Sequence, residues 1–244
     1  MEAVETFGEL KALDAAGDPR RSSWWAQGSP DYVADLRLRA EHVPALVSLA
    51  RRWEDQDWSA GDAAWAPVHA WRALGQLGAA EAVAPLLEML GPLDADHDDW
   101  FFEEFPHVVA LIGPAAVPAL GRYLADPGHR EYARVAAADG LCEIARRHPE
   151  AREEAGRILR EELERCERNP PTLNGFLVSY LADLGAGEAS HAIQQAYVAG
   201  RVDESVCGPW SRVGWEIDVL DEPPPEPVPF IELLDDVEPN GPYV

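Results

Sequence analysis

The chain has 244 residues, of which 47% are hydrophobic, and its 44 acidic side chains outnumber 20 basic ones to give a formal net charge of −24. The apolar content excludes a chain that is disordered throughout, and the length suits one domain or one array of repeats. A charge this negative argues against direct binding to nucleic acid or to an anionic membrane surface, so a partner bound by charge should be basic.

The cysteines and the N-terminus bear on the cellular compartment. Cys142, Cys166 and Cys207 lie far apart and form no C-x-x-C pair, which favours a reducing compartment and argues against a disulfide framework or a cysteine zinc site. The acidic N-terminus lacks a charged-then-apolar export signal, and no window approaches the roughly 20 apolar residues of a membrane helix. We therefore expect a cytoplasmic protein that makes no membrane contact.

The chain is predicted to begin with a capping region, residues 1–30, which contains a helix over about residues 2–16 and a proline-containing loop. A repeat array follows over residues 31–205. Each unit of the array reads as a helix A, a turn and a helix B. The units are predicted at about 31–56, 64–93, 98–127, 131–168 and 173–200.

Prolines mark the starts of three predicted B helices. Pro44, Pro85 and Pro118 each stand near the start of an apolar helical pattern, at spacings of 41 and 33 residues. Proline is tolerated in the first helical turn, where backbone N–H groups have no intrahelical acceptor. The sequence therefore predicts helix starts at these positions.

Glycines mark the ends of predicted A helices. Gly78, Gly113 and Gly185 each follow a leucine or isoleucine, and glycine just beyond a helix end adopts the left-handed conformation that terminates the helix. Between these marks, Phe101 and Phe105 open an apolar stripe that continues with helical spacing. One helix pair cannot bury such a stripe alone, so neighbouring pairs must stack. The expected fold is all-α, an α-solenoid of about five antiparallel helix pairs.

The last predicted region, residues 206–244, is a C-terminal extension. From Asp221 to Val244 it contains seven prolines, seven acidic residues and no basic residue. This composition cannot continue a helical array and predicts an extended acidic tail. Within the tail an apolar group could dock as one short helical turn: Phe230, Ile231, Leu233 and Leu234.

Two stretches resemble known repeat families. The A–B pattern and the run Gly-Pro-Ala-Ala-Val-Pro-Ala-Leu over residues 113–120 resemble bacterial HEAT-like repeats of the phycobilisome-lyase type, across about residues 30–200. A later stretch, from Asn174 to Arg201-Val202-Asp203, is similar to an uncharacterised bacterial family of HEAT-like proteins. The resemblance implies a fold and no activity, since no residue here requires bilin attachment.

The densest polar feature of the sequence is the acidic segment that starts at Asp94. Its D-x-D-x-D spacing matches the opening of an EF-hand calcium loop, but the sixth position is Asp99 instead of glycine and the twelfth is Phe105 instead of glutamate. The segment is then either a loop whose carboxylates cap the following helix or an acidic docking surface. It comprises Asp94, Asp96, Asp98, Asp99, Trp100, Glu103 and Glu104.

Aromatic residues beside these carboxylates suggest a ligand. Trp58 and Trp100 flank acidic loops, and an aromatic ring next to carboxylates suits an arginine or lysine side chain, by cation–π contact and ion pairing. Asp183 joins the candidate set because it falls in the apolar part of a helix without an evident structural role. Glu88, Arg122, Arg157 and Gln194, on the B helices, are expected to line the inner side of the stack.

Catalytic motifs are missing from the sequence. It contains no H-E-x-x-H, G-x-S-x-G, P-loop or G-x-G-x-x-G, and Glu103 with His107 supplies only two of the three or four ligands of a zinc site. The leading hypothesis is a non-enzymatic scaffold, adaptor or inhibitor that binds a basic protein or peptide, without catalytic residues, metal or cofactor. The alternative is a metal-dependent hydrolase or modifying enzyme that uses the segment Asp94–His107. The sequence leaves the oligomeric state open, with a monomer as the simplest case.

Overall fold

The structure is a computed structural model that describes residues 10–19, 30–55, 58–96, 98–185 and 187–223. All regular secondary structure in these residues is helical, which confirms the predicted all-α class. Residues 10–14 are α-helical. The α-helices whose bounds lie within the described residues are α2 (Tyr32–Asp35), α3 (Val43–Ala50), α4 (Ala66–Gln76), α5 (Val83–Ala95), α6 (Asp99–Ile112), α7 (Val117–Ala125), α8 (Glu131–Arg147), α9 (Arg152–Leu163), α10 (Pro171–Asp183), α11 (Ser190–Val198), α12 (Glu204–Cys207) and α13 (Trp210–Glu216).

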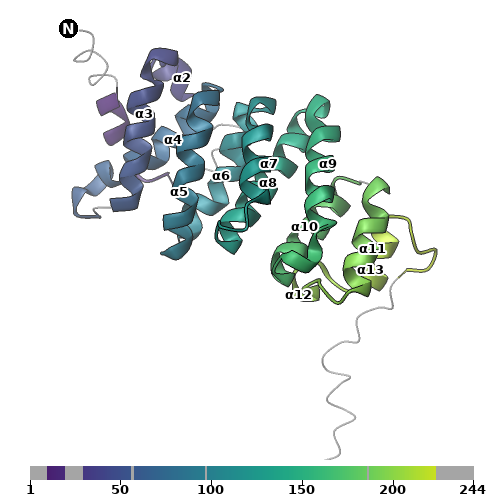
Figure 1. Ribbon diagram of the computed structural model, residues 1–244. Coiled ribbons are helices and arrows are strands. Elements are labelled where there is room, and N and C mark those ends of the chain that lie inside the picture. Colours follow the sequence, from purple (N-terminus) through teal and green to yellow (C-terminus); the bar gives the residue numbers. More distant parts are fainter. Residues whose placement is uncertain (1–9, 20–29, 56–57, 97, 186, 224–244) are drawn as a thin grey trace, which may run out of the picture.

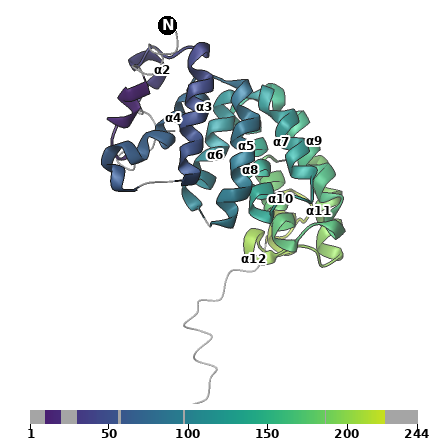
Figure 2. The same cartoon turned by 60° about the vertical axis from the view of Figure 1, so that its left-hand side comes forward.

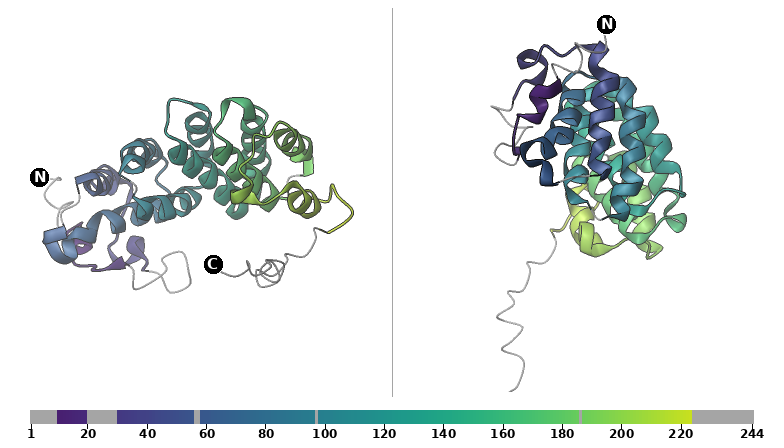
Figure 3. Two further views of the ribbon diagram at one scale, coloured as in Figure 1. Left: turned by 90° about the horizontal axis from the view of Figure 1, so that it is seen from below. Right: turned by 90° about the vertical axis from the view of Figure 1, so that its left-hand side faces the viewer.

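The helices lie in two layers that run along the molecule from α2 to α13 (Figure 1). In the A layer, α4 packs on α6, α6 on α8 and α8 on α10. In the B layer, α5 packs on α7, α7 on α9 and α9 on α11, with α3 at the beginning of the row (Figure 2). Viewed from below, the two layers appear as two rows of helices (Figure 3, left). Contacts across the layers, such as those of α7 and α9 with α8, bury the apolar stripes.

The predicted helix boundaries agree closely with the observed ones. The pairs α6–α7 and α8–α9 each fall inside one predicted unit, whereas α5 ends two residues after its predicted unit and α10 begins two residues before its own. Pro44 and Pro118 occupy the first turn of α3 and α7. Gly78 and Gly113, at the ends of α4 and α6, have φ values of 63° and 86°, the left-handed region in which glycine carries no steric cost. Two further helices were not predicted from the sequence: α12 crosses the predicted boundary between the array and the C-terminal extension, and α13 lies inside the extension.

The core is continuous and includes a chain of aromatic rings. Trp71 of α4 meets Phe101 of α6 edge-on at 5.0 Å between ring centroids, and Phe101 lies 5.7 Å from Phe105. All three side chains are fully buried. Close approach of α8 to α6 depends on Gly140, where a Cβ atom would lie 2.8 Å from a methyl group of Val109.

Two arginine–glutamate ion pairs lie inside this core. Arg72 of α4 pairs with Glu104 of α6, and Arg134 of α8 pairs with Glu162 of α9 at 2.7 Å. Arg134 also donates hydrogen bonds to the carbonyl of Leu124 and to Asn169. Since a buried charge is tolerated only when it is paired and hydrogen-bonded, each pair fixes how adjacent helices meet.

Asn174, the first residue of the later stretch with a family resemblance, is a buried polar residue of the core. It lies inside α10, is fully buried, and donates through Nδ2 to the backbone carbonyls of Cys166 (3.0 Å) and Arg201 (2.7 Å). The side chain therefore ties α10 to the chain segments before and after it. The N-cap position of α10 is Pro170.

Among the described residues, no single helix has both the length and the apolar composition needed to cross a membrane. The segments Asp99–Ile112 and Pro114–Ala125 satisfy those criteria only as a pair, with a bend of 111° between them. Both helices in that pair bury their apolar faces in the core.

Candidate functional site

Three carboxylates of the acidic segment line one small pocket, which we call the Asp94 pocket. It has a volume of about 170 Å³ and is lined by Asp94, Asp98, Asp99, Phe102 and Tyr132. The residues come from the end of α5, the start of α6 and the start of α8. The pocket therefore lies where two helix starts and one helix end meet.

Asp94 forms the buried wall of the pocket. Its side chain is 7% exposed, and Oδ2 accepts a hydrogen bond from the backbone N–H of Ala133 at 3.1 Å. The guanidinium of Arg130 lies 3.6 Å from the same oxygen. A carboxylate at the first turn of α8 is also stabilised by the positive end of that helix. Asp94 is thus held in place before any ligand arrives.

Asp98 and Asp99 differ in the hydrogen bonds that their carboxylates accept. Asp98 caps α6 by accepting from the N–H of Phe101 at 3.0 Å, and its second oxygen accepts from the indole of Trp53 at 2.7 Å. This confirms the predicted capping role of the segment. Asp99 is exposed and has no hydrogen bond or ion pair within the described part of the chain. Asp99 is therefore the carboxylate with free capacity for a ligand.

Aromatic rings complete the pocket. Tyr132 is 53% exposed, which is unusual for a large ring, and Phe102 is half-buried. An aromatic face beside carboxylates attracts a cation, because the ring quadrupole and the negative charges act on it together. Sequence reasoning missed Tyr132, since it stands 33 residues after Asp99 (132 − 99) on a different helix.

The remaining acidic-segment residues divide between surface and core. Asp96 and Glu103 are exposed. Trp100 is half-buried, lies 5.4 Å from Trp65 between ring centroids, and donates its indole N–H to Glu104 at 3.0 Å. Trp100 therefore packs against Trp65 and Glu104, and its recognition role stays a prediction. The side chain of Trp58 lies outside the described residues.

Glu104 is a core residue, contrary to its predicted place in a docking surface. It is 3% exposed and accepts hydrogen bonds from the indole of Trp71 at 2.7 Å and from Nε of Arg72 at 2.9 Å. The spacing of residues along α6 explains why Glu104 is buried. Glu104 follows Phe101 by three residues and precedes Val108 by four, so it shares the apolar stripe of α6.

Asp183 belongs to a separate feature, a ladder of polar side-chain contacts across the A layer. His107 of α6 lies 3.6 Å from Glu143 of α8, which pairs with Arg146 at 2.6 Å. Arg146 in turn pairs with Asp183 of α10 at 2.8 Å. Asp183 thus joins two neighbouring helices and is not near the Asp94 pocket. From the sequence, His107 was paired with Glu103 as possible metal ligands, but in the structure His107 contacts Glu143.

Asp139 lies near this ladder with an altered acidity. Burial, and next the negative charge of Glu143, raise the pKa of its carboxyl to about 6. The side chain makes no hydrogen bond within the described residues. The effect was not predicted, because residue 139 stands alone in an alanine-rich stretch of sequence.

The geometry bears on the metal-dependent alternative. Asp94, Asp98, Glu104 and His107 each contact different partners on different helices. Among the described residues, no three His, Cys, Asp or Glu side chains converge to hold a metal ion. His97 lies outside the described residues. The segment Asp94–His107 therefore presents no shared ligand set in the described part.

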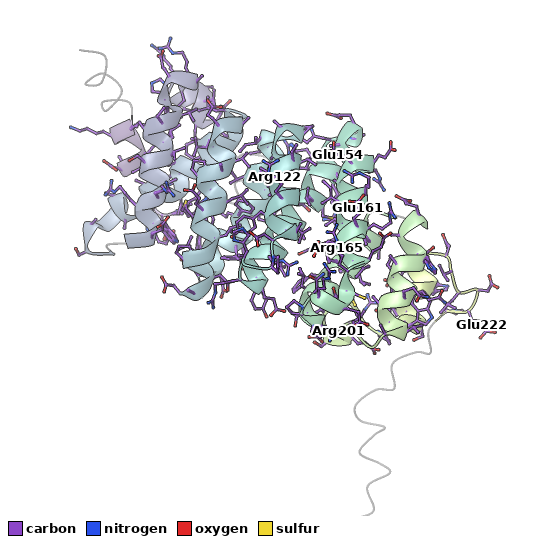
Figure 4. All side chains as sticks on the ribbon, in the orientation of Figure 1. Arg122, Glu154, Glu161, Arg165, Arg201 and Glu222 are labelled. Carbon is purple, nitrogen blue, oxygen red and sulfur yellow. The ribbon has the colours of Figure 1, made fainter. Side chains whose placement is uncertain are left out.

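Two grooves lie between helices of the B layer. One of about 530 Å³ lies between α5 and α7, and one of about 300 Å³ lies between α7 and α9. Glu88, Arg122 and Arg157 are exposed there, as expected for the B helices, and Gln194 is exposed on α11. Arg122 lines both grooves, and Glu154, Glu161 and Arg165 lie across from it on and after α9 (Figure 4). The second groove is close to neutral, because arginines and glutamates alternate along it.

Comparison of the chain with protein-family models, with curated proteins and with solved structures finds no match. Function must therefore be inferred from the geometry and charge of the molecule.

Proposed function

We propose that the protein is a non-enzymatic binding module that accepts an arginine or lysine side chain of a basic protein or peptide in the Asp94 pocket. The observation that carries the proposal is the arrangement of three carboxylates and two aromatic rings around one pocket. Asp94 is already balanced in part by Arg130. Asp99 supplies the charge that a ligand cation would neutralise.

The net charge supports the same class of partner. A formal charge of −24 attracts a basic protein over long range and speeds its encounter. A single captured side chain contributes little, since a cation–π contact is worth about 0.5–2 kcal/mol and an exposed ion pair about 0.2–1 kcal/mol. A useful affinity then requires a partner that touches more of the surface. This suits a scaffold, adaptor or inhibitor.

The fold part of the proposal is an α-solenoid of HEAT-like helix pairs. Its support is the repeated packing of each A-layer helix on the next and each B-layer helix on the next. The resemblance to phycobilisome-lyase-type repeats agrees with that packing and implies no activity. A stack of this kind presents a long surface to a partner. A cytoplasmic location agrees with the three cysteines, none of which forms a disulfide.

The test measures binding of a fluorescent arginine-rich peptide to the full chain and to Asp99→Asn. Losing the unpaired carboxylate should weaken binding about 3–5-fold, the equivalent of about 0.7–1 kcal/mol. Asp96→Asn is the matched control, because it removes the same charge from an exposed residue that does not line the pocket. Its effect should stay below about twofold, and binding should weaken as salt screens the charges.

Tyr132 provides a second, independent arm. Tyr132→Phe keeps the aromatic face and should bind as the natural chain does, whereas Tyr132→Ala should weaken binding about 3–30-fold. Equal effects of Asp99→Asn and Asp96→Asn would show general charge attraction and refute the pocket. If no basic peptide binds and purified protein contains a stoichiometric metal ion, the metal-dependent alternative is favoured.

A further inference from the structure

The C-terminal end of the helix stack exposes apolar side chains. Four large hydrophobic side chains are exposed in the described part of the chain, and three of them lie in or just after the last helices: Val198 (76%), Trp215 (45%) and Val219 (39%). The helices α11 and α13 form the end of the molecule opposite α2 (Figure 1). A repeat at the end of a stack lacks a neighbour, so its outer apolar surface needs a cover.

The chain turns back onto α13 as soon as that helix ends. Asp218 has φ 58°, and the N–H groups of Val219 and Leu220 both donate to the carbonyl of Gly214, at 2.8 and 2.9 Å. A Cβ atom at Gly214 would lie 2.9 Å from Leu220 and 3.1 Å from Trp210. The absent side chain therefore makes room for Leu220, and the chain beyond α13 starts in contact with that helix.

The C-terminal tail contains an apolar segment close enough to act as this cover. Residues 224–244 lie outside the described residues, and their apolar group is Phe230-Ile231 with Leu233-Leu234. Seven residues beyond Pro223 span up to about 23 Å when extended, whereas α13, with 7 residues, is about 10 Å long. Glu222 lies beside the last helices (Figure 4). The apolar group is thus within reach of the exposed side chains.

We propose that Phe230–Leu234 of the same chain docks on the C-terminal end of the stack and covers Trp215 and Val219. The contact is intramolecular, so the short connection keeps the local concentration of the segment high. Burial of its apolar side chains supplies the driving force. The acidic residues around the apolar group stay in water and give the covered end a polar outer surface.

The experiment compares the full chain with a double variant, Phe230→Ser with Leu233→Ser, by urea unfolding and by hydrogen exchange. We expect the unfolding equilibrium constant to rise about 10–100-fold, as for two partly buried apolar side chains. Amides of α13 should exchange several-fold faster, since the last helix loses its cover. Val237→Ser is the matched control, an apolar tail residue outside the docking group, and should change neither readout.

A double-mutant cycle identifies the covered surface. In a Trp215→Ser background the tail variant should cause little further loss, because its contact is already gone. Val219→Ser replaces Trp215→Ser if the latter fails to fold. Additive losses, or unchanged exchange in α13 on mutating the tail, would overturn the proposal. The proposal would also be overturned if the free energy of unfolding rose with protein concentration and sedimentation showed dimers. The segment that covers Trp215 would then come from a second copy of the chain.

Discussion

The buried carboxylate of Glu104 offers a sharp test of what holds the neighbouring helices α4 and α6 together. It is 3% exposed and accepts hydrogen bonds from Arg72, Trp71 and Trp100. In Glu104→Leu the Arg72 guanidinium, 2% exposed, would keep its charge and lose its carboxylate. Removing one partner of a buried ion pair costs about 3–5 kcal/mol, and a stranded buried indole N–H costs about 1–3 kcal/mol.

The loss of the ion pair and the loss of the indole hydrogen bond are not fully additive, because both groups lie at the same site and the same local relaxation eases both. We therefore expect Glu104→Leu to lower the free energy of unfolding by about 4–6 kcal/mol, a large part of the roughly 5–15 kcal/mol available to a folded domain. Urea unfolding followed by circular dichroism measures the change. The double variant Arg72→Met with Glu104→Leu should lose less, about 1–3 kcal/mol, because no charge is left unpaired.

Glu164→Leu is the control for this experiment. Glu164 pairs with Arg160 on the surface at 2.6 Å, and its side chain is 48% exposed, so its removal should cost below about 1 kcal/mol. If Glu104→Leu costs no more than Glu164→Leu, the reasoning from burial is wrong. A double variant less stable than Glu104→Leu alone would also contradict it.

Two further replacements test the packing around α8. The folded-state pKa of Asp139 is raised from 3.8 to about 6, so the native state holds a proton that the unfolded chain releases, and stability falls as pH rises between those values. Asp139→Asn should therefore raise the free energy of unfolding at pH 7 by about 1–2 kcal/mol and make that free energy depend less on pH. Equal stabilities of the natural chain at pH 4 and pH 7 would contradict this. Gly140→Ala should lower the free energy of unfolding by about 1–3 kcal/mol in the same urea assay, because the new methyl group meets Val109. The control Gly156→Ala, at a position where a Cβ atom would have no atom within 4 Å, should raise that free energy by up to about 1 kcal/mol. If Gly140→Ala leaves the stability unchanged, α6 and α8 can move apart without cost, and the packing argument is wrong.

The starts of α3 and α7 and the ends of α4 and α6 were readable from the sequence. Pro44 and Pro118 fix helix starts, and Gly78 and Gly113 fix helix ends, because each acts through its own backbone. The capping role of Asp98 is local in the same sense, since its acceptor group reaches an N–H only three residues away. The all-α class was predicted from these marks and from the apolar period.

Tertiary structure decided what each polar side chain touches. Asp99 and Glu104 belong to one acidic run, yet one faces water and the other lies in the core, because helical rotation and the neighbouring helix separate them. Tyr132 reaches the Asp94 pocket from α8, and Asp183 finds its counter-ion on α8, 37 residues away. Such contacts depend on how helices one repeat apart pack, and local backbone preferences contain no information about that packing.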